Sequence, residues 1–252
     1  MSKDMSLLVC GDPTTVNDGS EFGDIMSHIQ ESIDSVMAKL TWLSTQDATY
    51  ISTFGPLLGR ALLELSTTAL IGRLDPLRLL FVRQVQSQPT YDTGTRWKSS
   101  LQWQGDVLAE KPKPDMWSAQ TSYEDAPKAL LGAYYDHLLW RPAFQRMSGL
   151  PMTGAVWLAE LRATNADAFI NRKRATLSKL YSELSKGVHH EFVMPPGTLY
   201  DKPTIVDMVA RAVHELADVS YVSQFITHCQ YGLDADAATS ALTRLENLEV
   251  MK

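Results

Sequence analysis

The chain has 252 residues, of which 44% are hydrophobic and 21% are charged, so it can bury a sizeable core and is neither a disordered nor a fibrous protein. Cys10 and Cys229 are far apart and share no metal-ligand spacing, which indicates neither a disulfide framework nor a zinc site and predicts a reducing, cytoplasmic compartment. The apolar region from Gly55 to Gly72 carries Arg60 and Glu64, so it predicts a core helix and no membrane span.

The formal charge of −6 is unevenly distributed along the chain. Residues 1–35 contain seven acidic side chains and one lysine, and residues 162–186 contain six basic and two acidic side chains. This polarity favours a contact surface, although most charged stretches are solvated faces. The acidic segment 1–20 either remains free or folds onto the protein.

Three helices are predicted in the first third of the chain. Between Phe22 and Ser44 apolar residues recur every three or four positions, namely Ile25, Ile29, Ile33, Met37 and Leu40. Asp47 predicts the cap of a second helix that runs to about Gly72, and Asp75-Pro76 predicts the start of a third that runs to about Val85. Residues 7–10 are the one stretch with the character of a short strand.

Residues 88–124 change character, because prolines and glycines interrupt every longer period. Trp97, Trp103 and Trp117 lie among polar residues there. Tryptophans give such a segment surface to bury, so we expect an ordered, irregular insertion.

Four further helical regions follow the insertion. Asp125 and Pro127 predict the cap of a helix through Trp140, which Pro142 then kinks or ends. Two helical stretches lie between Ala155 and Gly187, with Gly187 as the terminator. Thr204 and Asp207 have the spacing of a capping box for a helix from Ile205 to about Tyr231, and Asp234 predicts the cap of a last helix. The whole pattern predicts an all-α helical bundle, with residues 1–252 forming a single domain.

The common sequence signatures of catalysis are absent from the chain. There is no phosphate loop of the form GxxxxGK[ST], no GxGxxG, no HExxH, no GxSxG and no EF-hand loop. We therefore predict no cofactor and no metal, and a non-catalytic role is favoured over an enzyme.

A basic helix that ends in two histidines is the most suggestive local cluster. Glu183, His189 and His190 are the candidate catalytic residues, because histidine exchanges protons near neutral pH and nearby cations hold a phosphodiester. The alternative, which is favoured, is structural: histidines just beyond a helix end bond its free carbonyls.

Residues 184–189, Leu-Ser-Lys-Gly-Val-His, resemble the LSxxVH-type ending of divergent, defence-associated HEPN families, whose core is a small bundle of helices. Members with nuclease activity carry an arginine that is separated from a histidine by four to six intervening residues. Neither His189 nor His190 has an arginine at those distances, where Ser182, Glu183, Leu184 and Ser185 stand. The resemblance covers about residues 170–192 and implies the non-catalytic branch.

A second constellation lies on the predicted helix that begins at Ile205. Asp207, Arg211, His214 and Asp218 are spaced by four, three and four residues and share one face. Either the two aspartates orient His214 and Arg211 in a cleft, or the stripe is a solvated face with ion pairs; the second interpretation is favoured.

The basic helix supplies the candidate binding residues. A nucleic acid or an acidic partner would contact Arg172, Lys173, Arg174, Lys179 and Lys186. We predict a non-catalytic helical interaction or accessory subunit of a larger bacterial-type assembly that acts on nucleic acid or in anti-phage defence. Protein partners in a hetero- or homo-oligomer are expected. Nucleic acid would bind through the partner or through the basic helix, and no contact with a membrane is expected. The alternatives are a HEPN-like ribonuclease and a nucleic-acid-binding module without catalysis.

Overall fold

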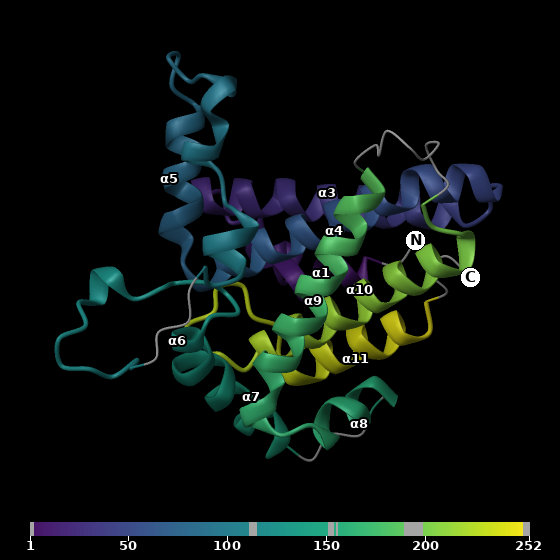
Figure 1. Ribbon diagram of the computed structural model, residues 1–252. Coiled ribbons are helices and arrows are strands. Elements are labelled where there is room, and N and C mark those ends of the chain that lie inside the picture. The colour runs from purple at the N-terminus through teal and green to yellow at the C-terminus, as the bar shows by residue number, and fades with distance from the viewer. Residues whose placement is uncertain (1–2, 111–114, 151–153, 155, 189–198, 249–252) are drawn as a thin grey trace.

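The computed structural model describes residues 3–110, 115–150, 154, 156–188 and 199–248, and it confirms the all-α prediction. The described residues form helices and short helical turns without a β-strand; one isolated bridge joins Gln104 to Leu108. Figure 1 shows the long helices packed into one body, from which helix α5 and the insertion extend.

Helices α3 (Glu21–Leu43) and α4 (Ala48–Leu74) pack against each other as an antiparallel hairpin. Each begins at a side chain that accepts from free N–H groups of the first turn: Ser20 caps α3 and Asp47 caps α4. The Asp47 cap confirms the prediction from the sequence.

Helix α4 occupies the centre of the bundle. It packs against α3, α9 (Ala166–Val188) and α10 (Lys202–Ser223). A Cβ atom added at Gly55 would lie 2.4 Å from Cγ2 of Ile205, so a residue without a side chain is required for the approach of α10. Residues from Met5 to Leu245 contribute to one continuous apolar core.

The N-terminal segment belongs to this core. Helix α1 (Asp4–Cys10), followed by the short α2 (Pro13–Val16), packs against α3, α10 and α11 (Ala235–Glu246). The side chains of Met5, Leu8, Val9 and Cys10 are fully buried. The strand considered for residues 7–10 is therefore wrong, and most of segment 1–20 folds onto the protein; seven residues are too few to show a helical period clearly.

Helix α5 (Pro76–Gln86) begins at Pro76 as predicted, although the side chain of Asp75 makes no capping hydrogen bond. The insertion then contains three short turns, η1 (Thr93–Ser99), η2 (Trp103–Val107) and η3 (Tyr123–Asp125).

The tryptophans of the insertion differ in exposure. Trp103 is buried and stacks on Tyr181 of α9, with ring centroids 4.1 Å apart. Trp117 is 60% exposed, and the side chain of Trp97 lies outside the described residues. Trp103 is thus the anchor that fixes η2 to the bundle.

The helix predicted to begin at Asp125 is wrong for its first half. Backbone N–H groups of Leu130 and Leu131 donate instead to the carbonyls of Asp106 and Val107 in the insertion. This pairing satisfies backbone groups that a helix would otherwise use. Helical structure starts with α6 (Ala133–Tyr135).

The chain around Pro142 stays helical, because a wide turn precedes it. Turn η4 (Asp136–Trp140) bonds the N–H of Arg141 to the carbonyl of Asp136 five residues back, and α7 (Arg141–Ser148) follows directly. Pro142 lies in the first turn of α7, where a missing N–H is tolerated. The helical chain therefore does not end at Pro142, and the predicted kink stays a prediction.

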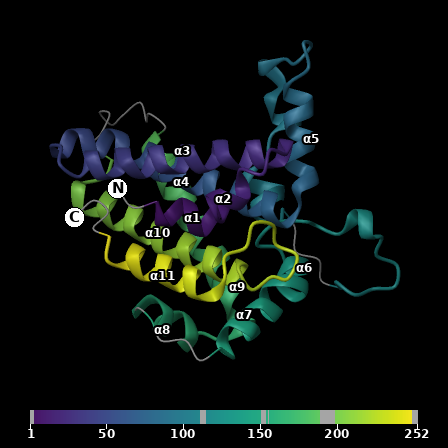
Figure 2. The same cartoon turned by 180° about the vertical axis from the view of Figure 1, so that it is seen from behind.

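The last four helices are α8 (Val156–Ala163), α9, α10 and α11. Helix α9 continues through Gly187 to Val188, so Gly187 does not end it within the described residues. Figures 1 and 2 show α9 and α11 on opposite sides of the bundle.

Two caps in this region had been predicted. Asp234 caps α11 as expected. Helix α10 is capped by Asp201, with Pro203 in its first turn, so the predicted capping box of Thr204 and Asp207 is wrong. The helix also ends at Ser223, before Tyr231; the N–H groups of Gln224, Phe225 and Ile226 bond carbonyls three residues back instead of four.

Candidate functional site

Some basic side chains of helix α9 are exposed to solvent, and others point into the protein. From residue 171 to residue 186 its exposed positions carry no carboxylate and no apolar side chain larger than alanine. We define the outer face of α9 by five exposed positions at spacings of three and four: Arg172, Ala175, Lys179, Ser182 and Lys186. Three of the five predicted binding residues therefore lie together on one accessible face.

The other two predicted binding residues are structural. Lys173 is buried, and its Nζ lies 2.7 Å from Oε2 of Glu215 and also bonds Asp218 of α10. The Nε of Arg174 donates to the carbonyl oxygen of Leu131 at 2.7 Å. Their assignment as partner-binding residues is corrected, because adjacent residues on a helix point in different directions.

The protonation of the buried pair follows from its surroundings. Burial opposes a charge on Lys173, but the carboxylates of Asp218 and Glu215 outweigh it, so the pKa of Lys173 is raised. Burial also raises the pKa of Asp218, against the opposing effect of Lys173 and His214. Lys173 is thus a bound ammonium group that fixes α9 to α10.

The second constellation is half buried, which corrects the favoured interpretation of a solvated stripe. Asp207 and Arg211 form an exposed pair at 3.4 Å, as an open face would have. The imidazole of His214, in contrast, stacks on Trp157 of α8 at 4.3 Å, and its Nε2 lies 3.7 Å from Oδ2 of Asp218. A hollow of about 380 Å³ between α8, α9 and α10 adjoins these groups.

The residues considered for RNA cleavage are only partly described. The carboxylate of Glu183 lies 3.7 Å from Nζ of Lys179, and its backbone carbonyl accepts from the hydroxyl of Tyr200. His189 and His190 lie outside the described residues. The catalytic interpretation of this cluster stays a prediction.

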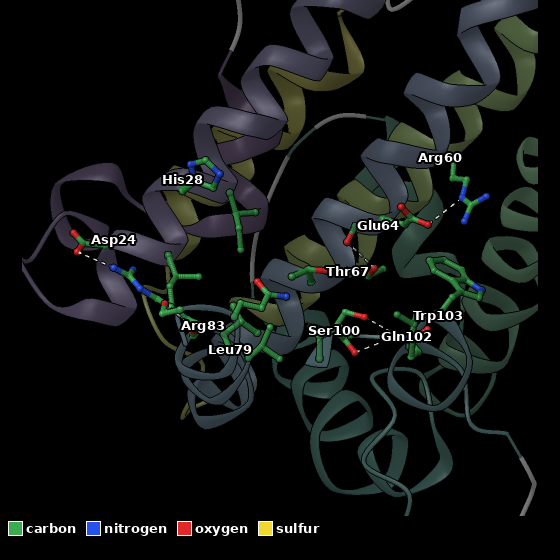
Figure 3. A pocket seen from close by; sticks show the side chains of 18 of the residues that line it. Asp24, His28, Arg60, Glu64, Thr67, Leu79, Arg83, Ser100, Gln102 and Trp103 are labelled. Atoms are coloured by element: carbon green, nitrogen blue, oxygen red, sulfur yellow. Dashed lines mark hydrogen bonds and ion pairs between the residues drawn. The ribbon is translucent and has the colours of Figure 1, made fainter. Parts of the chain in front are cut away.

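A larger hollow of about 940 Å³, which we call the groove, lies between α3, α4, α5, turn η2 and α9. Figure 3 shows Asp24, His28 and Arg83 on one side and Arg60, Glu64 and Trp103 on the other. Sequence reasoning missed the groove, because its walls come from five separate segments.

One wall of the groove is a closed polar network. Nε of Arg60 lies 2.9 Å from Oε1 of Glu64, and the hydroxyl of Tyr181 accepts from Arg60 and donates to Glu64. Burial opposes charge on Arg60, but Glu64 and Tyr181 outweigh it and raise its pKa. Burial, followed by Glu64, raises the pKa of Tyr181. With Trp103 stacked behind Tyr181, this wall is held in place.

Beyond the groove, toward the start of α4, three large apolar side chains are exposed. Tyr50, Phe54 and Leu57 are 48%, 44% and 49% exposed. At about 100° per residue they lie within about 80° of Glu64 and Thr68, which line the groove. We call these five residues the outer lane of α4. The sequence did not reveal it, because α4 is apolar on nearly every side.

Comparisons with known proteins give no relative for this chain. No protein-family model matches it, and searches of curated proteins and of solved structures find no significant match. The HEPN-like resemblance therefore stays a prediction.

Two further searches of the described residues concern metals and membranes. In that part of the chain, no three His, Cys, Asp or Glu side chains are grouped so that they can hold a metal ion. None of the helices there is both long and apolar enough to cross a bilayer.

Proposed function

We propose that this chain is a cytoplasmic helical interaction subunit, without a catalytic centre of its own, that works in a larger assembly acting on nucleic acid or in defence. The observation that supports this proposal is the outer face of α9. Arg172, Lys179 and Lys186 are exposed there, two helical turns apart, over about 21 Å. A face of this kind contacts an anionic partner through charge.

The expected contact is sensitive to salt. Exposed charges are screened over about 8 Å at physiological ionic strength, so each ion pair on this face contributes little alone and several must act together. Glu183 lies beside Lys179 and weakens the local positive potential. Removing that carboxylate with Glu183→Gln should strengthen the contact.

The test is affinity purification from the native host at low and high salt. The variant Arg172→Gln/Lys179→Gln/Lys186→Gln should lose a partner that the wild type retains at low salt. The matched control Lys39→Gln/Lys98→Gln/Lys128→Gln removes three exposed cations elsewhere and should retain it. Equal retention by both variants would exclude the outer face of α9 as the contact.

A nucleic-acid-binding module is the second candidate, and the composition of the outer face favours it. Protein interfaces rely on buried aromatic or apolar anchors, which this face lacks, whereas phosphates need only cations and hydrogen-bond donors such as Ser182. Fluorescence anisotropy with single-stranded RNA should show affinity that falls steeply with salt. For three phosphate contacts the slope of log K against log salt is about −2.

A further inference from the structure

We propose that the outer lane of α4 and the groove together form a docking site for one amphipathic helix of a protein partner, whose end in the groove is basic. This surface lies on α3, α4, α5, turn η2 and Tyr181 of α9, and it shares no residue with the outer face of α9. The inference therefore goes beyond the proposed function, and either can fail while the other holds.

The apolar half of the site is a set of large side chains that are exposed and that no described segment covers. The rings of Tyr50 and Phe54 stack with centroids 6.2 Å apart, and Leu57 follows one turn later. Trp42, 55% exposed, lies at the same end of the α3–α4 hairpin. Aromatic side chains gathered on a surface are the usual anchors of protein interfaces.

The groove half of the site accepts long side chains. Its volume of about 940 Å³ is at the upper end of ligand pockets, and its lining mixes apolar with hydrogen-bonding groups. Ile25, Ile29 and Leu79 can pack against aliphatic stems, while Gln86 and Gln102, whose amides donate to Ser99 and Ser100, add polar groups to the lining. Lysine and arginine combine such a stem with a charged head.

The charge around the groove selects a basic occupant. Exposed carboxylates stand on α3 and α4, and the two arginines of the lining are already held by them: Arg60 by Glu64, and Arg83 by Glu21 and Asp24 at 3.5 and 3.8 Å. Glu31 is exposed seven residues after Asp24 and thus on the same face of α3. At the groove itself three carboxylates, Glu21, Asp24 and Glu64, pair with two arginines, which leaves an excess of one negative charge.

The dimensions of the site match a single helix. The outer lane runs from Tyr50 to Thr68, about 27 Å at 1.5 Å per residue, which equals about 18 residues of a partner helix. Such a helix would place apolar residues at i, i+4 and i+7 on Tyr50, Phe54 and Leu57. Its basic residues would follow two to three turns later, in the groove. This is the helix-in-groove mode of recognition.

A photocrosslinking experiment in the native host tests the occupant directly. The variant Phe54→p-benzoylphenylalanine should capture a protein whose crosslinked peptide, sequenced by mass spectrometry, is a basic amphipathic helix. The same group at Phe81, an exposed phenylalanine on α5, is the control and should not capture it. A crosslink to a second copy of this chain, to a peptide without this pattern, or none at all would overturn the proposal.

Affinity measurements with the captured peptide sharpen the test. Phe54→Ala/Leu57→Ala should weaken binding about tenfold or more, whereas the matched variant Leu77→Ala/Phe81→Ala, also exposed, should leave it unchanged. Asp24→Lys should weaken binding and Asp236→Lys should not, since Asp236 is an exposed carboxylate at the start of α11, which lines no part of the groove. Equal effects of the two members of either pair would contradict the site. Circular dichroism confirms that each variant is folded.

Discussion

Two cations are buried among the described residues, and they are stabilised in different ways. Arg73, at the end of α4, is fully buried, and its hydrogen bonds go to uncharged acceptors. These acceptors are the carbonyls of Leu8, Val9 and Gln230, Oγ of Ser223 and Oε1 of Gln224. Lys173, in contrast, is paired with the carboxylates of Glu215 and Asp218.

The difference indicates which of the two regions makes the stability of the protein depend on pH. The carbonyls of Leu8 and Val9 belong to the last turn of α1, where a helix has free acceptors and partial negative charge, so the Arg73 centre has acceptors that do not titrate. The Lys173 centre contains titratable acids and adjoins a hollow. We therefore expect the Arg73 centre to govern stability, and the Lys173 centre to govern its dependence on pH.

The largest effect is expected for Arg73→Met. This change removes the guanidinium donor from the carbonyls of Val9 and Gln230, while Leu8 keeps a bond from Gln224 Nε2 and Oε1 of Gln224 keeps one from the N–H of Leu233. Because buried acceptors lose a charged donor, the free energy of unfolding should fall by more than about 3 kcal/mol. Urea unfolding followed by circular dichroism measures it. The free energy is obtained from the urea midpoint at an unchanged m-value. A decrease of less than about 1 kcal/mol would show that water replaces the guanidinium as donor.

Lys173→Met should have the next largest effect. It leaves Glu215 and Asp218 facing each other without a cation, which is expected to lower the free energy of unfolding by about 3 kcal/mol, because Glu215 is still partly solvated. Adding Asp218→Asn to this variant should recover part of the loss, because one buried charge is removed. A double variant less stable than Lys173→Met would contradict the assigned pairing.

Asp218 makes a smaller contribution to the free energy of unfolding, and this contribution changes with pH. Burial raises its pKa in the folded state, so the folded protein holds this proton more tightly than the unfolded chain, whose carboxyl has a pKa of about 3.9. The contribution of Asp218 to stability is therefore largest at low pH and falls as the pH rises from about 4 through the folded pKa. Unfolding curves of the wild type and Asp218→Asn are measured from about pH 3 to 7. The free energy of unfolding of the wild type minus that of Asp218→Asn should decrease as the pH rises.

The smallest effect is expected on the outer face of α9. Replacing Arg172, Lys179 and Lys186 by glutamine should change the free energy of unfolding by less than about 0.5 kcal/mol for each position, because exposed charges make few contacts. A loss comparable to that of Lys173→Met would mean that these cations stabilise the fold and are not reserved for a partner.

Most of the helical fold could be predicted, because apolar spacing and capping residues are local signals. Asp47, Pro76 and Asp234 mark helix starts by chemistry within one turn of the chain. The start predicted at Asp125 failed because Leu130 and Leu131 find backbone partners in the distant insertion. A signal within a few residues cannot reveal that competition.

The site was less predictable than the fold, for a geometric reason. The groove needs five segments to meet, and the exposure of Tyr50, Phe54 and Leu57 depends on which side of α4 its neighbours leave open. No residue of the outer lane of α4 carries a distinct chemical signal. Only the positions of α3, α5 and α9 around α4 reveal it.

The sequence by itself determined that Arg172, Lys173 and Arg174 lie on a helix and that their side chains point about 100° apart. Only the tertiary structure decided which of them is buried. Helix α10 packs on one side of α9 and brings two carboxylates to Lys173, while Arg172 remains exposed. Helical period is a property of the local backbone, whereas burial depends on contacts between residues distant in the chain.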